Sequence, residues 1–134
     1  MNVVSHPPLR AVPEPVDRPM EDGPGWFVDP TSGDDAAAGD EAHPWRTLGA
    51  AVPRLRAGDT LYLREGVYRE QVYCSVPGRA DAPVTVRAYP RERAVIDAGI
   101  AEFQTAPHEA WTPLDRGAPG EFRSVRAYPN LRDV

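Results

Sequence analysis

Two short β-rich stretches of this chain match each other at a spacing of 23 residues. Residues 61–64 align with residues 84–87, each an apolar alternation that ends in an arginine, and Val72 aligns with Val95. A repeat of about 20–29 residues that carries one strand in each copy is typical of solenoid rungs. One rung cannot bury its own apolar face, so about three or more rungs must stack. The sequence therefore predicts a β-solenoid, of which two rungs are visible.

The chain divides into a proline-rich arm at residues 1–25 and a structured part at residues 26–134. Six of the 16 prolines lie in the arm among few aromatic residues, which is typical of disorder. Residues 45–55 predict a helix, because apolar residues recur at i, i+3, i+4 and i+7: Leu48, Ala51, Val52 and Leu55. Pro53 removes one helical hydrogen bond, so we expect the helix to kink there or to end early.

Short strands are expected on both sides of this helix. They lie at residues 26–28, 60–63, 67–74, 84–89, 94–96 and 122–128, with a long loop at 103–119. Residues 86–90 recur letter for letter at 125–129, a spacing of 39 that an insertion within a rung or chance would explain. Solenoid ends need a polar cap, and none follows the last strand. We therefore expect the chain to be truncated at its C-terminus.

Composition excludes several classes of function. The net charge is −5, and the 15 arginines are dispersed among acids, which disfavours nucleic-acid binding. The sequence contains no run of about 18 apolar residues, so it predicts no membrane span. The first residues lack a signal-peptide pattern, so the chain is not exported by that route or its true start lies upstream. Cys74 is the one cysteine, which rules out an intramolecular disulfide, and its apolar surroundings predict a small core residue.

Several short motifs, taken in order, resemble the N-terminal end of right-handed parallel β-helix proteins of the pectate-lyase-like superfamily. They are residues 26–28 (Trp-Phe-Val), 33–34 (Gly-Asp), 44–48 (Pro-Trp-Arg-Thr-Leu), 57–63 (Ala-Gly-Asp-Thr-Leu-Tyr-Leu), 66–70 (Gly-Val-Tyr-Arg-Glu), 82–86 (Ala-Pro-Val-Thr-Val) and 95–97 (Val-Ile-Asp). The resemblance covers residues 26–99. The chain departs from the family at residues 97–99, where Asp-Ala-Gly replaces Asp-Gly, and at residues 39–40, where Gly-Asp replaces Gly-Thr.

The resemblance implies a mainly β fold, the N-terminal part of a single-stranded parallel β-helix whose open end is capped by the helix at residues 45–55. It implies a secreted or cell-envelope polysaccharide lyase, glycoside hydrolase or epimerase that acts on acidic polysaccharide. The full-length protein would be a monomer and could use calcium. The family's working residues lie on later coils, so no catalytic residue is assigned here, and this chain alone is expected to be inactive.

Two other hypotheses remain open. A non-catalytic β-solenoid, such as a surface, adhesion or carbohydrate-binding module, would use the same cap and rungs. Asp, Lys, Arg or His recurring at one rung position downstream would favour an enzyme, whereas apolar and Asn ladders would favour a binding role. A small independent β domain at residues 26–134 would instead melt cooperatively as a monomer, whereas we expect marginal stability or aggregation.

Carboxylates and histidines are the candidate metal ligands of the sequence. The loop after residue 28 is acidic and either holds calcium or is simply solvated, with the second reading favoured by its irregular spacing: Asp29, Asp34, Asp35, Asp40 and Glu41. The three histidines, His6, His43 and His108, are too scattered for a metal-ligand pattern.

Arginines and tyrosines are the candidate sugar contacts of the sequence. Arg64 and Arg87 occupy equivalent repeat positions, where they either line a groove for acidic sugar or form a solvated face. An acid must separate two such stacked charges, and Glu65, Glu70 and Glu92 are the candidates. Four tyrosines present either sugar-stacking faces or core packing: Tyr62, Tyr68, Tyr73 and Tyr89.

Overall fold

The computed structural model describes residues 13–128 of the chain, which are mainly β with short helices. The strands are β1 (Gly25–Val28), β2 (Thr60–Leu63), β3 (Gly66–Tyr68), β4 (Thr85–Ala88), β5 (Ala94–Ile96), β6 (Trp111–Pro113) and β7 (Phe122–Ser124). The helices are α1 (Leu48–Ala51), which continues as a 3₁₀ turn (Val52–Arg54), α2 (Ala101–Thr105) and α3 (Pro107–Ala110). Within the described part of the chain, no helix is long and apolar enough to cross a membrane.

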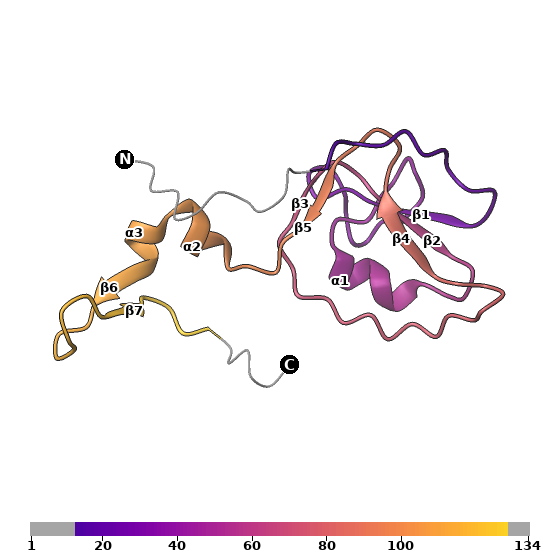
Figure 1. Ribbon diagram of the computed structural model, residues 1–134. Coiled ribbons are helices and arrows are strands. Elements are labelled where there is room, and N and C mark those ends of the chain that lie inside the picture. The colour runs from indigo at the N-terminus through magenta and orange to yellow at the C-terminus, as the bar shows by residue number, and fades with distance from the viewer. Residues whose placement is uncertain (1–12, 129–134) are drawn as a thin grey trace.

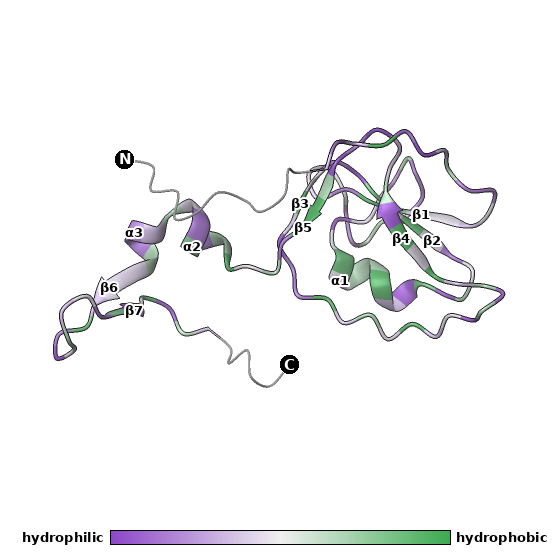
Figure 2. Ribbon diagram, viewed as in Figure 1, coloured by the Kyte–Doolittle hydropathy of each residue, from purple (hydrophilic) through white to green (hydrophobic). Residues whose placement is uncertain are grey.

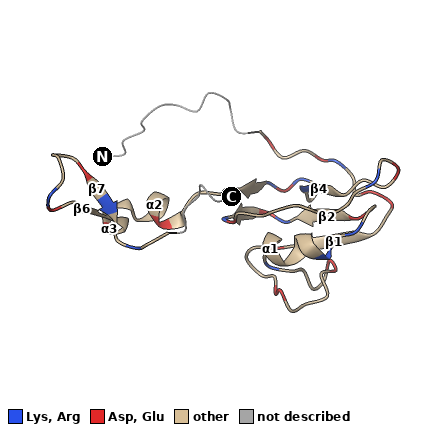
Figure 3. Ribbon diagram, turned by 90° about the horizontal axis from the view of Figure 1, so that it is seen from below, with Lys and Arg blue, Asp and Glu red and all other residues tan. Residues whose placement is uncertain are grey.

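Two small parallel sheets form the larger body of the molecule (Figure 1). One sheet has the order β1-β2-β4 and the other pairs β3 with β5, all in parallel. Figure 3 shows β1, β2 and β4 lying one above another. Because β2 and β3 are consecutive in the chain, as are β4 and β5, each of these two passages of the chain adds one strand to each sheet, whereas β1 adds a strand to the first sheet alone.

The strand register differs from the predicted repeat. Leu61 lies opposite Val86 rather than Val84, and Val95 lies opposite Val67 rather than Val72. The predicted spacing of 23 was therefore wrong by two residues in the first sheet and by more in the second. Side chains alternate between faces with a period of two, so a slip of two residues keeps every side chain on its face. The apolar pattern alone cannot detect such a slip.

The core lies between the first sheet and α1. Leu61 and Leu63 of β2 and Val28 of β1 pack there with the predicted apolar face of the helix. That face is fully buried, and Figure 2 shows α1 largely in the colour of hydrophobic residues. The α-helix ends at Ala51 and the chain tightens into the 3₁₀ turn that contains Pro53, so the expected early end is confirmed.

Three expectations about the remaining segments were wrong. The strand expected at residues 67–74 ends at Tyr68, and Cys74 is exposed rather than a core residue. Beyond Tyr68 no neighbouring strand pairs with the described chain, so it stays irregular although Val72 and Val76 still pack against the core. The stretch at 103–119 is not a loop but contains helical turns and a strand, with the Phe103 and Trp111 rings stacked at 4.4 Å.

The second copy of the repeated pentapeptide does not form a further strand of the parallel sheets. Its residues 125–128 follow β7, which pairs with β6 in an antiparallel hairpin, and residue 129 lies outside the described residues. The two copies therefore occupy different structural contexts, since the first contributes to β4 and the second lies after the hairpin strand β7.

Candidate functional site

Side chains that point away from the core on β1, β2 and β4, together with the residue that follows each of β2 and β4, form one polar and aromatic surface, which we call the outer face. It consists of Phe27, Tyr62 and Arg87 within the strands and of Arg64 and Tyr89 directly after them. Phe27, Tyr62 and Arg87 lie opposite one another across the three strands. The Phe27 and Tyr62 rings stack at 5.3 Å, and the Arg87 guanidinium carbon lies 5.7 Å from the Tyr62 ring centre. The fold thus brings together four of the six predicted sugar-contact residues.

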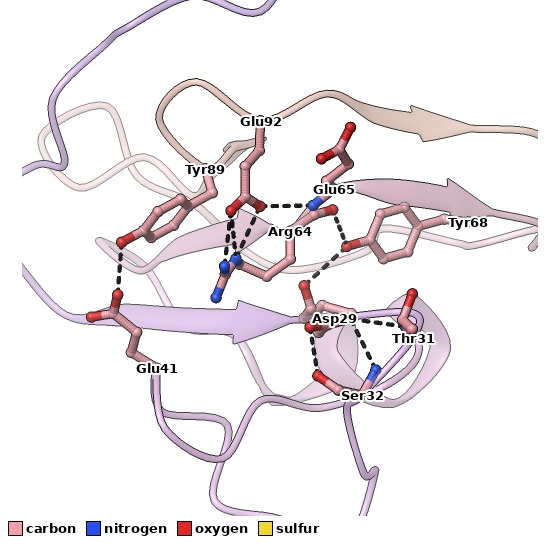
Figure 4. Close-up of polar contacts among 10 residues, drawn as sticks. Asp29, Thr31, Ser32, Glu41, Arg64, Glu65, Tyr68, Tyr89 and Glu92 are labelled. Atoms are coloured by element: carbon pink, nitrogen blue, oxygen red, sulfur yellow. Dashed lines mark hydrogen bonds and ion pairs between the residues drawn. The ribbon is translucent and has the colours of Figure 1, made fainter.

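Arg64 is held in a bidentate ion pair with Glu92 (Figure 4). Its Nε lies 2.9 Å from Oε2 and its Nη2 lies 2.8 Å from Oε1 of Glu92, whose Oε2 also accepts the backbone N–H of Glu65 at 2.7 Å. The hydrogen bonds from Arg64 lower the pKa of Glu92, and the same contact raises the pKa of Arg64. Glu92 is thus the acid beside Arg64. Arg64 and Arg87 are not equivalent, however, because Arg87 lies opposite Tyr62.

Tyr89 joins this pair to the acidic loop. The Arg64 guanidinium carbon lies 4.6 Å from the Tyr89 ring centre, and the Tyr89 hydroxyl donates to Oε1 of Glu41 at 2.7 Å. That hydrogen bond raises the pKa of Tyr89. A line of polar contacts therefore runs from Glu41 through Tyr89 and Arg64 to Glu92.

The other two candidate tyrosines lie elsewhere. Tyr68 is buried, with its hydroxyl 2.9 Å from the Val28 carbonyl oxygen and 2.8 Å from that of Arg64. Burial raises the pKa of this hydroxyl, which joins the ends of β1 and β2. Tyr73 is exposed beside Pro53 and Leu55. Neither ring is available to a ligand on the outer face.

The carboxylates of the acidic loop bind local donors rather than converging. Asp29 accepts the N–H groups of Thr31 and Ser32 and the Ser32 hydroxyl. Slight burial raises the pKa of Asp29, but these hydrogen bonds outweigh it and the net pKa is lowered. Asp35 likewise accepts from the backbone and hydroxyl of Thr47, and its pKa is lowered in the same way.

No three His, Cys, Asp or Glu side chains gather as a metal site within residues 13–128. Asp34 accepts the backbone N–H of Ala36, and Asp40 that of His43, whose ring nitrogen is 3.1 Å from the same carboxylate. His108 is exposed next to Glu109, and His6 lies outside the described residues. This geometry gives the calcium hypothesis no support.

Sequence reasoning missed the partners of the outer face. Glu41 bonds to Tyr89 across 48 positions, and Arg87 donates to the carbonyl oxygens of Arg18 and Pro19 across 69 and 68 positions. Every residue has a backbone carbonyl, so an acceptor of this kind cannot be recognised from the sequence. Contacts between residues so far apart in the chain also produce no local periodic pattern. The segment before β1 is thereby part of the site.

Comparison with known proteins places carbohydrate-active proteins among the relatives. No family model matches the chain. It is 34% identical over 96 residues to pectate lyase PEL9 of Emericella nidulans, a match to 70% of this chain and 23% of that protein. It is 36% identical over 90 residues to the uncharacterized protein YwoF of Bacillus subtilis, covering 63% of this chain and 19% of YwoF. The chain thus spans a quarter or less of the length of these curated relatives.

A solved structure supports the same comparison. The complex of XylC with xylose superposes with a TM-score of 0.54 at 30% identity, covering 68% of this chain and 13% of XylC. The resemblance therefore extends from sequence to backbone over the larger part of the chain.

Proposed function

We propose that the chain is the N-terminal cap and first coils of a right-handed parallel β-helix, at residues 26–134 after an arm at residues 1–25. The observation that carries this proposal is the order of the paired strands. Each of β4 and β5 returns in parallel beside its predecessor, β2 and β3 respectively. Parallel neighbours need a crossover connection, and a coil that adds one strand to each of two sheets provides it. In this proposal α1 covers the open end of the core.

The whole protein would be a secreted, monomeric, carbohydrate-active enzyme, a lyase or hydrolase of acidic polysaccharide. The pectate lyase match supports an acidic polysaccharide as the substrate, whereas the XylC superposition supports only the broader class of carbohydrates. Elimination from a uronic sugar needs a base and a stabilising cation, to which a calcium ion in the full-length protein would be suited. On the outer face Arg64 is neutralised by Glu92, so the catalytic residues would lie on further coils.

Polygalacturonate depolymerisation tests this proposal. The 134-residue chain and a longer protein that includes adjoining coding sequence are incubated with polygalacturonate, and the unsaturated product is followed by its ultraviolet absorbance. Reducing ends are counted in parallel to detect hydrolysis. We expect product only from the longer protein. Turnover by the 134-residue chain would contradict the assignment of catalysis to other coils.

A second candidate, a non-catalytic carbohydrate-binding or adhesion solenoid, is favoured by one observation. Both arginines of the outer face are satisfied by the chain itself, Arg64 by Glu92 and Arg87 by the segment before β1. Coils whose charged side chains are already paired within the chain are compatible with a structural scaffold as well as with an enzyme. Retention of the longer protein on polygalacturonate without any product would favour this candidate.

A further inference from the structure

The segment before β1 crosses the outer face of the parallel sheet. We call residues 16–21 the strap. They form neither helix nor strand, and they pass β4 and the corner after it before the chain enters β1 (Figures 1 and 3). Tyr62 points away from the core, yet it is only 1% exposed, and its hydroxyl accepts the backbone N–H of Glu21 at 2.8 Å. The strap therefore shields an aromatic surface that would otherwise face solvent.

Arg87 holds the middle of the strap. Its Nη2 donates to the Arg18 carbonyl oxygen at 2.7 Å and its Nη1 to the Pro19 carbonyl oxygen at 3.1 Å. The Glu21 carboxylate lies 3.6 Å away, and the Arg87 side chain is only 10% exposed. Arg87 is thus surrounded by oxygen acceptors that all come from the strap.

Arg91 holds the other end of the strap. Its side chain pairs with Asp17 at 2.5 Å and its backbone N–H donates to the Val16 carbonyl oxygen at 3.1 Å. Both side chains of this pair are largely exposed, and exposed pairs contribute little to stability. Val16 itself is 72% exposed and Met20 is 39% exposed, so the strap's own apolar side chains are not anchored in the core. Segments of this kind open at a far lower free energy than the core strands.

The strap presents Arg87 with the same chemistry that an acidic sugar would. A uronic acid offers a carboxylate and hydroxyl oxygens to a guanidinium, and an apolar ring face to an aromatic side chain. Here the acceptors come from Arg18, Pro19 and Glu21, above the Tyr62 ring. A hollow of about 280 Å³ beside the strap, lined in part by Val16, Arg18, Arg87 and Glu92, leaves room next to these groups.

We propose that residues 16–21 are a self-inhibitory strap that occupies Arg87 and the outer face in place of an acidic sugar and must lift before the sugar can bind. This inference rests on the proposed function for its ligand class. It assigns Arg87 the role of a binding residue that the chain itself holds closed.

Removal of the strap tests the proposal. A variant that lacks residues 1–21 and the intact chain are titrated calorimetrically with a galacturonic acid oligomer, with a neutral xylose oligomer as the control ligand. We expect the deletion variant to bind the galacturonic acid oligomer about tenfold more tightly, because a closed strap lowers affinity by the open fraction. Arg87→Gln in the deletion variant should abolish that gain. Equal affinities of the intact and deleted chains, both folded by circular dichroism, overturn the proposal.

A second variant tests the strap in the intact chain. Arg91→Gln removes the tie to Asp17, and Arg79→Gln is the matched control, since Arg79 pairs with Asp81 at only 3.8 Å on an exposed surface. We expect Arg91→Gln, but not Arg79→Gln, to speed amide hydrogen exchange in residues 16–24. The galacturonic acid oligomer should speed it further in both the intact chain and the Arg91→Gln variant. If amide hydrogens of the strap exchange as slowly as those of β2 in every sample, the strap is a fixed part of the fold and the proposal is refuted.

The two proposals fail separately. If the longer protein depolymerises polygalacturonate while the deletion variant gains no affinity for the galacturonic acid oligomer, the self-inhibitory strap is refuted and the proposed function stands. If the deletion variant gains affinity for the galacturonic acid oligomer and the longer protein yields no product, the strap is supported and the enzymatic function fails.

Discussion

Replacement of Glu70 by alanine should destabilise the chain by about 2 kcal/mol, because Glu70 caps α1 from a distant part of the sequence. Its Oε1 accepts the N–H of Leu48 at 2.9 Å and its Oε2 accepts the N–H of Gly49 at 2.8 Å. The Thr47 hydroxyl accepts the N–H of Ala50 at 3.1 Å. An α-helix leaves its first four N–H groups without helical partners, and these two side chains satisfy three of them.

The magnitude follows from what is lost. A hydrogen bond to a charged group contributes about 1.5–3 kcal/mol, and a helix cap about 1 kcal/mol. The bond to Gly49 is exposed, so water replaces much of it in the variant, which leaves a net loss of about 2 kcal/mol. The Glu70→Gln variant retains one acceptor oxygen, so it should lose about half as much. Because α1 carries Leu48 and Ala51 into the core, the loss should affect global unfolding.

Urea unfolding followed by tryptophan fluorescence measures this effect, since Trp26 and Trp45 stack at 5.3 Å against the core. Glu65→Ala is the matched control. The Glu65 side chain is exposed, and its contact to Glu92 uses the backbone N–H, which the substitution leaves in place. If Glu70→Ala unfolds at the same urea concentration as Glu65→Ala, the capping role is refuted.

Three further predictions concern the ion pair, acid stability and a pair of glycines. In a double-mutant cycle, Arg64→Gln and Glu92→Gln should show a coupling of about 1 kcal/mol, and additive losses would contradict the bidentate pair. Because Glu92 and Asp35 have pKa values lowered from 4.5 and 3.8, stability should be full above these values and fall as pH drops below them; a melting temperature that rises on acidification would oppose this sign. Gly39→Ala should cost more than about 2 kcal/mol in a thermal melt, because at φ +83° its Cβ would lie 2.3 Å from the Trp45 ring. Gly120→Ala, at φ +89° with nothing within 4 Å, should cost only the backbone strain of about 1 kcal/mol.

The strands that the sequence predicted best are those whose pattern is bounded on both sides by turn residues. The strands at residues 60–63 and 94–96 appear with the predicted limits. The buried helical face was also predictable, because a period of 3.6 residues is unambiguous over two turns. Register was not predictable, since a period of two residues is unchanged by a slip of two. Cys74 shows the related error: an apolar alternation predicts a strand there, but this segment pairs with no strand of the described chain.

The outer face was partly predictable for the same reason. Residues of one parity within a strand share a face, which is why Tyr62 and Arg64 lie together, and why Arg87 and Tyr89 do. Their partners were less accessible to sequence reasoning. Glu92 was one of three acids considered for Arg64, and only the corner after β4 places it 2.8 Å from the guanidinium. The strap contacts depend on backbone oxygens, which every residue carries.

The two ends of the parallel stack differ in a way that bears on the β-helix proposal. At the β1 end, the chain covers the strand edge: the N–H of Phe27 donates to the Gly39 carbonyl and that of Trp45 to the Phe27 carbonyl. At the other end, the inward position of β4 is 42% exposed at Val86, whereas Leu61 opposite it is 0% exposed. In the second sheet Ile96 is 57% exposed, whereas its partner Tyr68 is 1% exposed.

This asymmetry indicates the direction in which a stack of this kind gains from another coil. A strand paired along β4 and β5 would bury Val86 and Ile96 as Leu61 and Tyr68 are buried, at roughly 1.5–3 kcal/mol for each side chain fully removed from water. The same addition at the β1 end would have to displace the loop that holds Trp45. In the proposed β-helix a further coil would therefore stack on β4 and β5, the side on which the strap contacts Arg91.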